Sequence, residues 1–225
     1  MSKPDPSARF SSRAAARDGL AERLLQLVGQ IPSPRTSVQK APRASAKTLT
    51  RTAAVKASAT AGTLALPPGA LGWLTIAPEL LAVWKMQRQL VADIAGVYGR
   101  EDLLSREQML YCLFGHTAAG AFRDVVIRAG ERYLIRKAPL SALYAIANKI
   151  TLRIAQRSAS RMVTRWIPLA GALGVAGYVY IDTGKVADTA IALFESDVSI
   201  EDDATATEPE VIKPRRTRRK AANGD

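Results

Sequence analysis

One cysteine and one histidine occur in this chain, and they stand four residues apart, at Cys112 and His116. On a helix this spacing places both side chains on one face, where a thiolate and an imidazole could bind a metal ion. A zinc site needs three or four protein ligands, and only the fold could bring carboxylates to complete this pair. We therefore favour packing for both residues and predict no metal and no cofactor. A single cysteine also excludes an internal disulfide and is typical of a reducing compartment.

Two enzyme templates fail at the level of motif. The glycine-rich run GALGVAG at 171–177 lacks the preceding strand and the Gly-Lys-Ser/Thr ending of a phosphate-binding loop. A single histidine in an apolar helix argues against a Ser-His-Asp arrangement. We therefore expect a non-enzymatic protein and assign no catalytic residue.

Basic residues repeat every four positions in two runs. Steps of four drift about 40° around a helix, so each run would wind slowly along a helical surface. Such a surface could contact lipid phosphates or a nucleic-acid backbone, or it could be an ordinary solvated face, and the two interpretations weigh evenly. The runs are Arg128, Arg132 and Arg136, then Lys149, Arg153, Arg157, Arg161 and Arg165.

Two apolar stretches, Leu64–Trp84 and Trp166–Ile181, could contact a membrane or pack against each other. A spanning helix needs about 20 apolar residues, whereas the second stretch has 16 and prolines interrupt the first. We expect shallow or re-entrant insertion, with both stretches at one end of the molecule and the glycines allowing close helix approach. The tryptophans suit either a membrane boundary or a core. The membrane or packing residues are Pro67, Pro68, Gly69, Trp73, Trp84, Trp166, Pro168, Gly171, Gly174 and Gly177.

Three charged residues follow the second apolar stretch at steps of three, namely Asp182, Lys185 and Asp188. Charges inside a membrane can mark a functional site. On a helix, however, the same spacing favours pairing of these side chains with one another. We expect them to lie at the edge of the apolar segment and to pair.

The elements that position these residues are predicted to be helices, because strand-like alternation is nearly absent. Gly99 suits a left-handed helix cap, and Ser105 with Gln108 has the spacing of a capping box. We expect the helix that starts at Ser105 to run toward Lys137 and the helix after Pro139 to extend toward Arg165.

The net charge of +12 is unevenly distributed, with +8 over residues 1–60, +6 over 61–194 and −2 over 195–225. We predict an all-α bundle of long helices between disordered termini. Residues 1–46 form a basic arm with a short helix and a flexible Pro-rich linker at Ile31–Ala46. Residues 47–194 form the helical domain. Residues 195–225 form an acidic and then basic disordered tail.

Two motifs resemble the EcsC family of bacterial proteins. DIAGVYG at Asp93–Gly99 follows an apolar Pro-Gly turn and a helix containing Gln-Arg, and it looks like the family's central signature. The pattern IPLAG…G…T…VA…A at Ile167–Ala190 resembles the C-terminal signature. The resemblance covers about residues 56–194. It implies a helical, membrane-associated protein and carries over no catalytic residue.

The favoured function is that of a non-enzymatic, membrane-associated protein on the cytoplasmic face of the cell membrane. Its expected partners are anionic lipids and a membrane protein complex, as an accessory to transport or to an envelope process. The alternative is a nucleic-acid-binding protein that uses the basic arm, the arginine runs and the tail. No oligomeric state is predicted.

Overall fold

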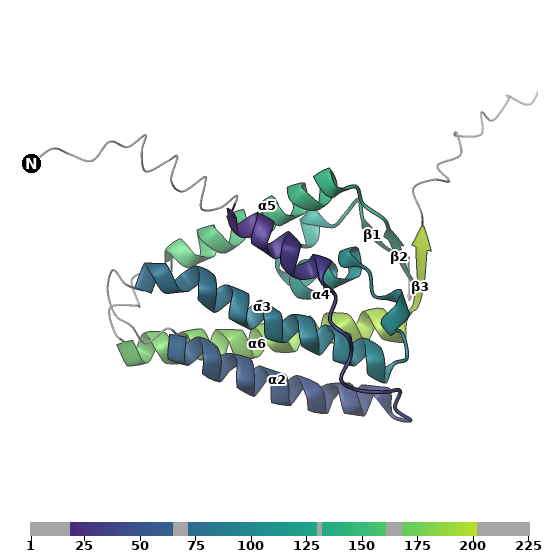
Figure 1. Ribbon diagram of the computed structural model, residues 1–225, viewed down its shortest axis with the longest axis horizontal. Coiled ribbons are helices and arrows are strands. Elements are labelled where there is room, and N and C mark those ends of the chain that lie inside the picture. Colours follow the sequence, from purple (N-terminus) through teal and green to yellow (C-terminus); the bar gives the residue numbers. More distant parts are fainter. Residues whose placement is uncertain (1–18, 65–71, 130–131, 161–167, 202–225) are drawn as a thin grey trace, which may run out of the picture.

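The computed structural model describes residues 19–64, 72–129, 132–160 and 168–201 (Figure 1). The prediction of a bundle of long helices is confirmed. A first helix covers residues 19–29 of the described chain. The longer helices are α2 (Pro42–Leu64), α3 (Gly72–Val97), α4 (Arg106–Ala118), α5 (Leu140–Ser160) and α6 (Pro168–Glu195). Two short 3-10 helices, η2 (Glu101–Leu103) and η3 (Ala119–Ala121), flank α4.

Helix α6 is the central element, because it packs against α2, α3 and α4. Its interface with α2 is the largest between two helices of the described chain, and the two lie side by side in Figure 1. Gly62 of α2 approaches Ala176 of α6, while Arg43 at the start of α2 pairs with Glu195 at the end of α6. These two contacts make the pair antiparallel. Small residues on the facing sides, such as Ala57 and Ala61, permit the close approach.

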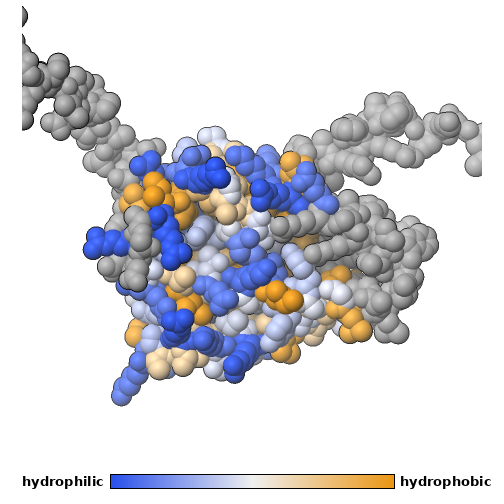
Figure 2. All heavy atoms as spheres, turned by 180° about the vertical axis from the view of Figure 1, so that it is seen from behind, coloured by the Kyte–Doolittle hydropathy of each residue, from blue (hydrophilic) through white to orange (hydrophobic). Residues whose placement is uncertain are grey.

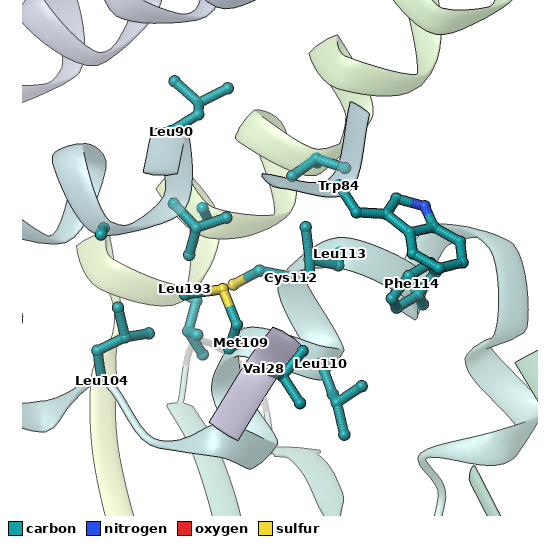
Figure 3. Close-up of a cluster of buried hydrophobic side chains, with 14 of the residues drawn as sticks. Val28, Trp84, Leu90, Leu104, Met109, Leu110, Cys112, Leu113, Phe114 and Leu193 are labelled. Atoms are coloured by element: carbon teal, nitrogen blue, oxygen red, sulfur yellow. The ribbon is translucent and has the colours of Figure 1, made fainter. Parts of the chain in front are cut away.

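The main core lies where the helix at 19–29, α3, α4 and α6 meet (Figure 3). Trp84 is 4% exposed, and its ring meets Phe114 edge to face with the centroids 5.3 Å apart. A smaller apolar cluster joins α2, α3 and α6 through Ala57, Val83 and Val179. Val83 belongs to the first predicted apolar stretch and Val179 to the second, so the two stretches contact each other in this cluster, as predicted.

Two local signals that the sequence predicted are confirmed. Gly99 has φ of 64°, and the hydrogen bonds from Gly99 to Gly96 and from Arg100 to Ala95 close the end of α3 as a Schellman motif. Ser105 and Gln108 form a reciprocal capping box at the start of α4. Helix α4 therefore begins where the sequence places it.

The expected course of this helix toward Lys137 is wrong, because α4 ends at Ala118. After η3 and a turn, strands β1 (Val126–Ala129) and β2 (Arg132–Arg136) form an antiparallel hairpin. Strand β2 alternates, with Tyr133 and Ile135 buried and Arg132 and Arg136 exposed. This period of two supports a half-buried strand, and the hairpin adds a small sheet to the helical fold.

The predicted disorder of the tail is also wrong for its first residues. Strand β3 (Asp197–Glu201) pairs in parallel with β2, which gives a sheet of order β1-β2-β3. The end of α6 is fixed by hydrogen bonds from the Tyr98 hydroxyl to Glu195 and from Arg100 to the Ser196 carbonyl. These contacts fix the position of residues 195–196, and strand β3 begins at the next residue. The rest of the predicted disordered tail, residues 202–225, and residues 1–18 of the predicted N-terminal arm lie outside the described residues.

The predicted flexible linker is instead an ordered strap, formed by residues 31–41, that lies across α3. The backbone N–H of Arg35 and the hydroxyl of Thr36 each donate to Asp93 over 2.7 Å. The N–H of Gln39 donates to the Val97 carbonyl over 3.1 Å. Gly96 has no side chain where the strap crosses, and a Cβ there would lie 2.6 Å from Pro34. The prolines therefore stiffen a docked segment, and α2 starts at Pro42.

Candidate functional site

The outer face of α6 exposes large apolar side chains. Leu173 is 72% exposed, Ile181 60% and Tyr180 45%. The sequence from Pro168 to Ile181 carries no charge, so this part of the helix surface offers apolar and aromatic groups without a competing ion. Figure 2 shows orange side chains on the rear face among hydrophilic ones, including some next to the grey segments. This arrangement can contact an apolar phase or an apolar partner.

The glycines of α6 do not act as predicted. Gly174 and Gly177 are exposed, and a Cβ at either position would meet no atom within 4 Å in the described chain. The close helix approach occurs at Gly62, whose Cβ would lie 3.3 Å from Ala176. The prediction that Gly174 and Gly177 mediate packing is therefore wrong, because both fall on the side of α6 that faces away from α2.

Trp84 is a core residue, which excludes the interfacial alternative for this tryptophan. Trp73, Pro168 and Gly171 lie in the helices α3 and α6, but their side-chain surroundings are outside the description. The remaining predicted membrane or packing residues, Pro67, Pro68, Gly69 and Trp166, lie outside the described residues.

The first predicted basic run does not form a helical ladder. Arg128 lies on β1, whereas Arg132 and Arg136 lie on β2. Arg128 pairs in register with Tyr133, and its guanidinium lies 5.5 Å from the centre of that ring. Directly paired residues share a face of a sheet, so Arg128 points to the side opposite Arg132 and Arg136. The hairpin thus separates the charge of Arg128 from those of Arg132 and Arg136.

The second predicted basic run lies only partly within the described chain. Lys149 and Arg153 are exposed on α5, and Arg153 donates to the Thr117 carbonyl over 3.0 Å. Arg157 belongs to α5, but its side chain is not described. Arg161 and Arg165 lie outside the described residues.

Helix α2 also carries exposed basic side chains that the sequence reasoning missed. They are Arg43, Lys47 and Arg51 at steps of four, and Lys56, which lies on the side of the helix opposite Lys47. Helix α2 contains no acidic residue. The sequence shows three of these basic residues at steps of four. The first of them, Arg43, falls within residues 31–46, which were interpreted as a linker and not as part of a helix.

A polar cluster joins α3, α4 and α6 inside the protein. The Nε2 atom of His116 lies 2.9 Å from Asp182 Oδ1, and the amide of Gln87 donates to Asp182 Oδ2 over 3.0 Å and lies 3.2 Å from the Thr183 hydroxyl. Gln87 and Thr183 are buried, and His116 and Asp182 are mostly covered. The predicted pairing of Asp182 with Lys185 and Asp188 is therefore wrong, because Asp182 turns inward while the other two are exposed.

In this cluster the carboxylate of Asp182 fixes the position of the His116 ring. The Nδ1 atom of His116 is buried and has no hydrogen-bond partner among the described residues. Cys112, one turn earlier on α4, is fully buried, and desolvation raises the pKa of its thiol. In the described chain no three His, Cys, Asp or Glu side chains are placed to hold a metal ion. The cluster therefore contributes to the interior of the bundle.

Comparison with known proteins finds no matching family model, no matching curated protein and no matching solved structure. The similarity to the EcsC family stays a prediction from the two motifs. Among the helices of the described ranges, none combines the length and the apolar composition needed to cross a bilayer.

Proposed function

We propose that this protein is a non-enzymatic protein that associates with the surface of an anionic membrane, on the cytoplasmic side, through the outer face of α6. The observation that carries the proposal is the exposure of Leu173, Tyr180 and Ile181 on a helix segment with no charged residue. Exposed apolar surface of this kind favours contact with an apolar phase.

The energetics support surface attachment without a spanning helix. Burying one large aliphatic side chain completely contributes about 1.5–3 kcal/mol, so two partly exposed ones give a modest anchor. Tyrosine suits the headgroup level, because its ring is apolar and its hydroxyl can remain in water. Attraction of the basic protein to anionic lipid adds to this anchor. We expect reversible, peripheral binding that weakens as salt rises.

Vesicle flotation tests the proposal. The full chain is mixed with vesicles of phosphatidylcholine alone or with about one third phosphatidylserine, at low and at physiological salt. We expect flotation with the anionic vesicles and little with the neutral ones. Absence of the protein from both lipid fractions would contradict the proposal.

A matched pair of variants locates the contact. Ile181→Asp places a charge on the exposed apolar face of α6 and should weaken vesicle binding about tenfold or more. Leu140→Asp is the control, because Leu140 is 62% exposed but begins α5, next to the sheet. Circular dichroism confirms that both variants fold. Equal binding by both variants would place the contact elsewhere.

A further inference from the structure

Strand β3 complements β2 in charge at both ends of their parallel pairing. The register places Asp197 beside Arg132 and Glu201 beside Arg136. Neighbouring positions in register lie on the same face of a sheet, and opposite charges at such positions stabilise the pairing of two strands. Arg132 and Arg136 are exposed, so this is the outer face of the sheet. A strand shifted by one residue would lose both charge matches.

The opposite face of the same two strands is apolar. Tyr133 and Ile135 of β2 are 4% and 1% exposed. The register places Val198 beside Tyr133 and Ile200 beside Ile135. The sequence that complements this edge of β2 is therefore acidic–apolar–any–apolar–acidic. A phosphate backbone would match the two arginines but neither apolar position, so the pattern favours a peptide over a nucleic acid.

The contacts that hold the end of α6 stop at Ser196, one residue before β3. The Tyr98 hydroxyl donates to Glu195 over 2.7 Å, and Arg100 donates to the Ser196 carbonyl over 3.1 Å. Within the described chain β3 is an edge strand, and β2 is the strand with which it pairs. A short edge strand can open by local unfolding at a lower free-energy cost than the core. Strand β3 can therefore leave β2 while α6 stays in place.

We propose that the edge of β2 is a binding site for an extended peptide segment of the pattern acidic–apolar–any–apolar–acidic. Strand β3 fills this site within the chain, and a segment of the same pattern on a partner protein replaces it by pairing with β2. Backbone hydrogen bonds to the strand edge supply affinity, and the charged and apolar positions supply selectivity. Because β3 competes with the partner, the apparent affinity falls with the fraction of molecules in which β3 is detached.

The test measures binding of a peptide with the sequence of residues 196–202 to full-length proteins, followed by the NMR shifts of the β2 amides. The variant Asp197→Lys with Glu201→Lys places like charges beside the two arginines and should detach β3. The matched control, Asp202→Lys with Asp203→Lys, adds the same charge directly after the strand. Circular dichroism establishes folding, and hydrogen exchange of the β2 amides reports the detachment of β3.

We expect the peptide to bind the detached variant at least tenfold more tightly than the control, because its site on β2 is open. Equal affinity for the variant and the control would overturn the inference, because attraction to the added positive charge would then explain binding. The inference also fails if the β2 amides of the folded variant do not shift at about 1 mM peptide, the effective concentration that a short flexible linker supplies.

A charge swap tests the same site from the side of β2. The full-length variant Arg132→Glu with Arg136→Glu should repel its own β3 and bind a peptide that carries lysine at both acidic positions. The unaltered peptide should bind this variant at least tenfold more weakly than the lysine peptide does. The reverse preference, or none, would overturn the inference even if the Asp197→Lys and Glu201→Lys variant does not fold.

Discussion

Individual polar side chains in the interior depend on one another for their hydrogen bonds. Asp182 accepts a hydrogen bond from the Gln87 amide and lies within hydrogen-bond distance of the His116 ring. It is therefore the partner of two polar groups that have little access to water. A buried polar group that loses its partner costs about 1–3 kcal/mol. We therefore expect Asp182→Ala to lower the free energy of unfolding by about that amount, as measured by urea denaturation. Asp188→Ala, an exposed change on the same helix, should leave the midpoint unchanged. Equal midpoints for both variants would contradict the structural role.

The buried thiol gives the fold a specific sensitivity to alkaline pH. Burial raises the pKa of Cys112, whereas an unfolded thiol ionises near pH about 8.5. Above that pH the unfolded state releases a proton that the folded state keeps, so the free energy of unfolding falls as pH rises. Between about pH 7.5 and 9.5 the parent should lose about 1 kcal/mol more than Cys112→Ala.

This pH window separates the thiol from the tyrosines. Burial raises the pKa of Tyr111 to about 12, but an unfolded tyrosine ionises only near pH about 10. Tyrosines therefore affect stability at higher pH than the thiol does. Denaturation curves at several pH values measure the difference between parent and variant. An identical pH dependence of the free energy of unfolding in the parent and in Cys112→Ala would show that burial does not raise the pKa of Cys112.

At the level of elements, the strap depends on the absence of a side chain at Gly96. A Cβ there would lie 2.6 Å from the ring of Pro34 and 2.7 Å from the carbonyl oxygen of Thr36. Gly96→Ala should therefore displace the strap, destabilise the protein by about 1–3 kcal/mol and speed proteolysis within residues 31–41. Gly174→Ala is the matched control, because its Cβ enters open space and alanine favours the helix by about 0.5–1 kcal/mol. Similar proteolysis of both variants would show that the strap does not need Gly96.

The elements also show what the sequence can and cannot predict. The caps at Gly99 and Ser105 were predictable, because their chemistry involves residues within one or two turns. The docking of the strap was not, because Asp93 lies 58 residues beyond Arg35 and composition cannot reveal such a partner. The apolar stretch of α6 was evident, but which of its residues face solvent depends on α2 and α3. The arginine spacing in 128–136 fits a helix, yet this segment forms two strands, because β1 and β2 pair with each other through backbone hydrogen bonds.

On the scale of the whole molecule, the helix at 19–29 completes the main core. Leu24 is fully buried in the same cluster as residues of α3, α4 and α6. Arg88 of α3 donates to the carbonyls of Leu27 and Gln30 at the end of this helix, and desolvation lowers the pKa of its guanidinium. Leu24→Ala should therefore destabilise the entire fold by about 2–5 kcal/mol in thermal melts. Glu22→Ala, an exposed change on the same helix, serves as the control, and a melt of Leu24→Ala that matches it would show that the helix is dispensable.

The antiparallel pairing of α2 with α6 has a consequence for synthesis. The chain leaves the ribosome at roughly 5–20 residues per second, so α6 follows α2 by about ten seconds. During that interval Ala57 and Ala61 lack the helix that covers them in the finished protein. Contacts between distant segments also form late, since closing a long loop costs chain entropy. Nascent α2 is therefore a basic helix whose largest interface is still open, and ribosomal RNA and anionic membrane are surfaces that it can contact before α6 exists.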